Sequence, residues 1–160
     1  MQAHASSPRT MSTPAEVSPL LRRRDDTALS EMLDGYGAHG GLASTADIVS
    51  LMRVHWRQPI SMLSRWIVSR KVVSFTYRGE ILLPLFQFLR PRMTPNDCVQ
   101  EVSAQLADLL DDEGLGAWFV RTSEWLGNAM PVDLVVAEPA AVVDAARRTR
   151  DRLLAGRGAA

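Results

Sequence analysis

Apolar side chains recur every three or four residues in two stretches that follow residue 44. The pattern predicts a helix capped by Ser44 or Thr45 and a second helix that Pro59 opens; the apolar positions are Ile48, Leu51 and Met52, then Ile60, Leu63, Ile67 and Val68. β-Branched and aromatic residues fill 72–77, Arg78-Gly79 turns the chain, and 80–84 returns as a second strand. Two helices and a β-hairpin are the outline of a helix-turn-helix with a wing.

The second half of the chain shows helical spacing only. Thr94 is expected to cap a helix with Pro95 at its first position, and its apolar residues are Val99, Val102, Leu106, Leu109 and Leu110. In 123–146, Gly127-Asn128 makes a turn, and Pro131 and Pro139 each open a helix. The last helix is predicted over 139–154, ended by Gly156 and Gly158. The pattern therefore predicts a mainly α fold with one β-hairpin.

Residues 1–44 are rich in Ser, Thr, Pro, Ala and Gly and lack a sustained apolar period. We expect a weakly ordered arm here, with one short helix over 27–33. The string Gly35 to Gly40 fits the glycine spacing of a dinucleotide-binding loop, but no buried strand precedes it, so a linker is favoured. The predicted organisation is an arm (1–44), a winged-helix-like part (45–92) and a helical module with a tail (93–160).

The net charge is zero, but the charges are segregated. Residues 45–92 hold eight cations and two acids, whereas 93–138 hold nine acids and one arginine. This division indicates two surfaces with different partners, or two halves that attract each other within the fold. A single cysteine, no signal-like leader and no apolar run long enough for a bilayer favour a cytoplasmic protein without membrane contact.

Catalytic chemistry has little support in this sequence. His4 and His39 fall in the predicted arm, and His55 is better explained as a helix-end or packing residue. Cys98 has no neighbouring histidine and is expected to be a buried, inert thiol. The acidic run 111–113 is too compact for a calcium loop. We therefore expect a non-enzyme with no cofactor, no catalytic residue and no metal site.

The basic half supports a nucleic-acid alternative. Four cations lie on or after the second predicted helix and at the hairpin tip, where a winged helix contacts phosphates: Arg65, Arg70, Lys71 and Arg78. The same helix carries a broad apolar face with Trp66 and has no Asn or Gln to read bases. These four cations therefore have two alternative roles: binding to promoter DNA, or a purely structural role.

Two groups of residues together resemble a known family. Leu83-Pro84-Leu85-Phe86-Gln87-Phe88 looks like the P-x-F-Q-F element of the Xre/MbcA/ParS antitoxins. Trp118, Trp125-Leu126-Gly127, Pro131 and the run from Val142 to Ala146 resemble the C-terminal toxin-binding domain of that family, in the same order. The resemblance covers about residues 45 to 150.

The resemblance implies a bacterial antitoxin that forms homo-oligomers and neutralises a RES-domain, NAD-degrading toxin, with repression of its own operon in many members. Carried onto this sequence, it implies partner-binding roles for Trp118, Trp125, Leu126 and Pro131, and makes the tail residue Arg157 a candidate plug for the toxin cleft. Two alternatives remain: a winged-helix DNA-binding transcriptional regulator, and a non-enzymatic structural adaptor of phage or plasmid origin.

Overall fold

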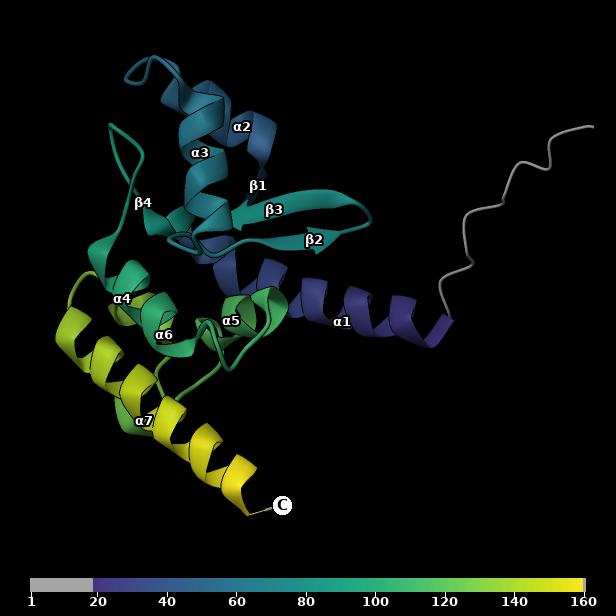
Figure 1. The fold of residues 1–160 in the computed structure, drawn as a ribbon, viewed down its shortest axis with the longest axis vertical. Helices are drawn as coiled ribbons and strands as arrows, with labels where there is room; N and C mark the ends of the chain where they lie inside the picture. Colours follow the sequence, from purple (N-terminus) through teal and green to yellow (C-terminus); the bar gives the residue numbers. More distant parts are fainter. Residues whose placement is uncertain (1–18, 160) are drawn as a thin grey trace, which may run out of the picture.

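A computed structural model describes residues 19–159 as a mainly helical protein with small antiparallel sheets, which confirms the predicted fold class (Figure 1). The α-helices are α1 (Pro19–Tyr36), α2 (Thr45–Met52), α3 (Pro59–Val68), α4 (Asp97–Leu106), α5 (Asp112–Trp118), α6 (Pro131–Leu134) and α7 (Pro139–Gly158). The strands are β1 (Leu42–Ser44), β2 (Phe75–Tyr77), β3 (Glu80–Pro84), β4 (Phe88–Leu89) and β5 (Thr94–Pro95). Short 3-10 helices are η1 (Gly37–His39), η2 (Leu85–Gln87) and η3 (Glu124–Leu126).

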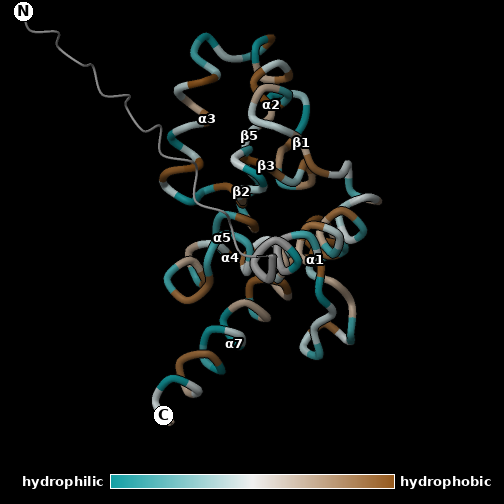
Figure 2. Tube along the Cα trace, turned by 90° about the vertical axis from the view of Figure 1, so that its right-hand side faces the viewer, coloured by the Kyte–Doolittle hydropathy of each residue, from teal (hydrophilic) through white to brown (hydrophobic). Residues whose placement is uncertain are grey.

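The three-stranded sheet, ordered β1-β3-β2, separates two hydrophobic clusters. Successive side chains of a strand point to opposite faces. Ala43 and Leu83 therefore pack with α2 and α3, whereas Leu82 and its cross-strand partner Phe75 pack with the helices on the other face. Figure 2 places α2 and α3 at one end of the molecule and the end of α7 at the other. Each face of the sheet therefore packs against one of the two clusters.

Local signals determine where α2 and α3 begin. The Ser44 hydroxyl accepts from the Asp47 N–H, and the Asp47 carboxylate accepts from the Ser44 N–H, which makes a capping box. Pro59 occupies the first turn of α3. Trp66 then packs edge-on against Trp56, whose indole N–H donates to the Arg92 carbonyl at 2.6 Å. The predicted starts of these two helices are therefore confirmed.

The larger cluster forms where α4 packs along α7. Val99, Val102 and Leu106 on α4 are fully buried, as are Val142 and Ala146 on α7. Two predicted details here are wrong. The cap of α4 is Asn96 and not Thr94, because Thr94 and Pro95 pair with β4 as a strand. Helix α7 continues past residue 154, its predicted end, and past Gly156, and it ends at Gly158, the second of the two glycines that were expected to end it.

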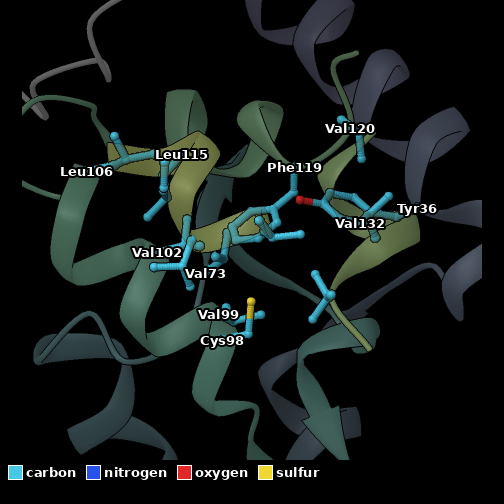
Figure 3. Packing of buried hydrophobic residues seen from close by; sticks show 14 of the residues in the cluster. Tyr36, Val73, Cys98, Val99, Val102, Leu106, Leu115, Phe119, Val120 and Val132 are labelled. Atoms are coloured by element: carbon cyan, nitrogen blue, oxygen red, sulfur yellow. The ribbon is translucent and has the colours of Figure 1, made fainter. Parts of the chain in front are cut away.

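The prediction of a weakly ordered arm is wrong for the described residues 19–44. Helix α1 occupies 18 of these residues. Met32 is fully buried in the larger cluster, as is Tyr36 (Figure 3). The Tyr36 hydroxyl donates to the Gly116 carbonyl at 2.5 Å. Leu33, on the same helix, is half exposed. Residues 1–18, including His4, lie outside the described residues.

The glycine string is not a linker. Gly35 lies inside the last turn of α1, and a Cβ placed there would lie 2.4 Å from the Cβ of Val120. This close approach lets α1 lie directly on the segment that follows α5. Beyond it, Gly40 and Gly41 have φ angles of 93° and 75°, a conformation that favours glycine, and lead into β1. The string is therefore a helix end and a tight turn.

Cys98 is buried at the start of α4, as expected. Burial raises the pKa of its thiol to about 11, and the carboxylate of Glu101 adds to the effect. Because the folded-state pKa exceeds the ordinary value of 9.0, the thiol stabilises the fold fully below pH 9, and this contribution is lost as the pH rises towards 11. At pH 9 we expect iodoacetamide to alkylate the native protein about tenfold more slowly than the urea-unfolded chain. Equal rates would contradict this assignment.

Candidate partner-binding site

A groove of about 430 Å³ lies between the end of α5, the loop that contains η3, and the second half of α7. Trp118 and Trp125, both predicted to bind a partner, line it and are half-buried. The other lining residues come from the loop and from α7: Arg121, Thr122, Ser123, Glu124, Asn128, Thr149, Arg152 and Leu153. The structure therefore brings the two predicted tryptophans into one surface feature.

Trp118 is held in a fixed orientation. Its indole N–H donates to the Thr149 hydroxyl at 3.1 Å, and that hydroxyl donates to the Ala145 carbonyl at 2.9 Å. Its ring packs edge-on against Phe119, with the ring centroids 5.1 Å apart. With its polar group satisfied and one edge on the core, Trp118 presents apolar surface to the groove.

Trp125 lies under a cation. The guanidinium carbon of Arg152 is 4.3 Å from the ring centroid, within the range of a cation–π contact. The same guanidinium forms an ion pair with Glu124. Both charged side chains are more than half exposed, so this pair contributes little to stability and can exchange partners.

The loop that carries Trp125 is closed by its own main chain. Ser123 N–H donates to the Ala129 carbonyl at 3.0 Å, and Asn128 N–H donates to the Ser123 carbonyl at 2.9 Å. Gly127 and Asn128 both adopt left-handed conformations, with φ angles of 65° and 64°. The turn predicted at these two residues is present, and it positions Trp125 opposite α7.

The remaining predicted partner-binding residues lie elsewhere. Pro131 is buried and opens α6, while Leu126 packs against the larger cluster. Both residues therefore contact the larger cluster or its helices more than they face the groove. Arg157 is exposed near the end of α7, and its guanidinium donates to the Leu109 carbonyl at 3.3 Å. It is not among the residues that line the groove.

The groove residues on α7 were not predicted, because their position depends on how α7 crosses the loop. Thr149 and Arg152 are three residues apart on α7, so they face the same side of that helix. The sequence showed this spacing, but not which segment α7 would cover.

The segregated charges meet within the fold. Arg150 pairs with Asp108, and Arg147 pairs with Glu101. Part of the acidic stretch thus neutralises α7.

The four cations predicted to contact DNA are not equivalent. Arg70 forms an ion pair with Asp112 at 2.8 Å and donates to the carbonyls of Ala107 and Leu110, so it joins the end of α3 to α4 and α5. Arg78 pairs with Asp26 of α1 at 3.4 Å. Arg65 and Lys71 are exposed. DNA binding through these two residues stays a prediction, and two of the four residues make structural contacts instead.

Residues 19–159 offer little support for other kinds of site. No three His, Cys, Asp or Glu side chains of this part gather to hold a metal ion. None of its helices combines the length and hydrophobicity that crossing a bilayer requires. Comparison of the chain with family models, with curated proteins and with solved structures finds no match. The Trp118–Trp125 groove is the surface feature that gathers the predicted partner-binding tryptophans.

Proposed function

We propose that this protein is an antitoxin-like binding protein that neutralises a partner toxin by docking it on the Trp118–Trp125 groove. The single observation that supports this best is the convergence of the two tryptophans on one open groove (430 Å³). Tryptophan and arginine are the residues most enriched among those that dominate binding energy at protein interfaces. The family resemblance adds the class of the partner, a RES-domain toxin.

The groove offers a partner two kinds of contact. Trp118 and the exposed part of Trp125 provide flat apolar surface for an apolar or aromatic side chain. Arg152 provides a guanidinium whose present partner, Glu124, is on the surface. A carboxylate of the docked protein can replace Glu124 there, because a charge-assisted hydrogen bond gains strength once water is excluded.

Co-expression with the toxin encoded by the neighbouring gene tests the proposal. We expect the two proteins to co-purify and growth to be restored. Trp125→Ala and Arg152→Ala are each expected to weaken the complex by about tenfold or more, as loss of a central interface residue does. Arg148→Ala is the matched control: Arg148 is exposed on the same helix and does not line the groove.

Two results would count against this function. One is failure of the neighbouring protein to co-purify or be neutralised. The other is a pair of groove variants that bind as tightly as Arg148→Ala, provided that circular dichroism shows all three to be folded. The first result would reject the antitoxin function. The second would show that the partner does not dock in the groove.

A further inference from the structure

A second groove lies at the opposite end of the molecule, between α2, α3 and β3. Its volume is about 570 Å³. Val49 and Ser50 of α2 form one wall, and Ile60, Leu63 and Ile67 of α3 form the other, with Ile81 of β3 at one side. Its residues are distinct from those of the Trp118–Trp125 groove.

Large apolar side chains remain in contact with water around this groove. Val68 is 84% exposed, Ile60 63% and Ile81 36%, and all three line it. Contiguous exposed apolar surface of this kind marks interaction sites more often than scattered single residues do. The outer face of α3 is therefore suited to protein contact rather than to the polar readout of bases.

Among the described residues that line the groove, the charged side chain is a cation, and the acids Asp47 and Glu80 adjoin lining residues at its edge. Arg53 lines it, and Arg57 and Arg65 are exposed on the same two-helix unit. None of these three cations forms an ion pair with any side chain that the structure describes. The sequence from 48 to 79 contains no Asp or Glu. On α7, by contrast, Arg147 and Arg150 are paired with acids.

We propose that this groove docks an amphipathic helical segment of a second protein, whose apolar face is flanked by Asp and Glu. An apolar trough between two helices accepts the anchors of such a helix at positions i, i+3, i+4 and i+7. Acidic flanks complement the unpaired arginines. A symmetric contact with a second copy is disfavoured, because it brings the cations around the two grooves towards each other. The surface is independent of the function proposed above.

Two synthetic peptides of about four helical turns, with the same leucine face, test the proposal on the full-length protein. One has glutamate and the other lysine on the flanks. Fluorescence anisotropy is expected to show the glutamate peptide binding about tenfold more tightly than the lysine peptide. Arg53→Glu is expected to abolish or reverse that preference.

Surface variants locate the contact. Val68→Ser and Ile60→Ser are each expected to weaken binding of the glutamate peptide by about tenfold, and both sites are exposed enough to tolerate the change. Val136→Ser is the matched control, since Val136 is also 84% exposed but does not line the groove. Unchanged affinity in the control supports docking in the groove.

Three outcomes would overturn the proposal. The first is equal affinity for the two peptides or no binding of either. The second is a dimer, measured by light scattering, that Val68→Ser dissociates, because the groove then holds a second copy. The third is displacement of the glutamate peptide by duplex DNA of random sequence, because the arginines would then bind DNA phosphates instead of peptide carboxylates.

Discussion

Replacing Gln87 with leucine is expected to lower the free energy of unfolding by about 3 to 5 kcal/mol, because three buried main-chain groups are involved. The Gln87 side chain is fully buried. Its oxygen accepts from the Val73 N–H at 2.6 Å, and its amide nitrogen donates to the carbonyls of Val73 (2.8 Å) and Pro84 (3.0 Å). Val73 is itself 1% exposed, so water cannot replace the lost partner. Urea unfolding followed by tryptophan fluorescence measures the effect.

Gln105→Leu is the control for this substitution. Gln105 is half-buried on α4, and no hydrogen bond of its side chain occurs within the described residues. We expect its replacement to change stability by less than about 0.5 kcal/mol. If Gln87→Leu also fell within that range, the hydrogen bonds to Val73 would not hold the chain between α3 and β2 in place. Gln87 belongs to the element that resembles the antitoxin family, which gives that element a structural role here.

Gly35→Ala is expected to destabilise the protein by about 2 kcal/mol, although alanine is the better helix former by about 1 kcal/mol. The new methyl group would lie 2.4 Å from the Cβ and 2.6 Å from the Cγ1 of Val120. Neither side can yield easily, because Tyr36 fixes α1 to Gly116 and Val120 is buried. Thermal unfolding followed by circular dichroism at 222 nm measures the loss.

Gly156→Ala separates this steric effect from helix propensity. Gly156 is also inside a helix, but a Cβ there meets nothing within 4 Å. This variant is expected to be neutral or more stable. In the Gly35→Ala background, Val120→Ala removes the 2.6 Å contact but not the 2.4 Å one, so the double variant should recover part of the loss. Purely additive effects would show that α1 does not pack on Val120 as described.

The elements that the sequence predicted correctly have signals within a few residues of one another. The capping box at Ser44, the prolines that open α3, α6 and α7, and the turn at Gly127 are all local. The incorrect cap of α4 shows the limit of such signals. Thr94 is a good cap by type, but pairing with Leu89 extends the chain there, and Asn96 takes the role.

The helix predicted over 27–33 is part of α1, but the full length and burial of α1, and the groove, could not be predicted because they depend on contacts between distant segments. Leu29, Met32, Leu33 and Tyr36 keep helical spacing for only about two turns. Tyr36 bonds to a residue 80 positions later, which no local pattern shows. The composition of 1–44 suggested disorder for the same reason. Trp118 and Trp125 could be selected by residue type, but Arg152 could not, because its place over Trp125 depends on how α7 packs against α4.

The burial of α1 among later segments has a consequence for biosynthesis. A chain emerges from the ribosome amino-terminal end first, and domains form as their segments become available. The cluster around α2 and α3 uses residues 43–93 and can assemble early. The larger cluster around Tyr36 combines Phe86, on which the Tyr36 ring stacks, with residues of α4 to α7 that are made later. Until those residues are made, the larger cluster that α1 joins is incomplete, and the Tyr36 hydroxyl lacks its Gly116 acceptor. We therefore expect nascent chains that end before α5 to present this helix to chaperones and proteases.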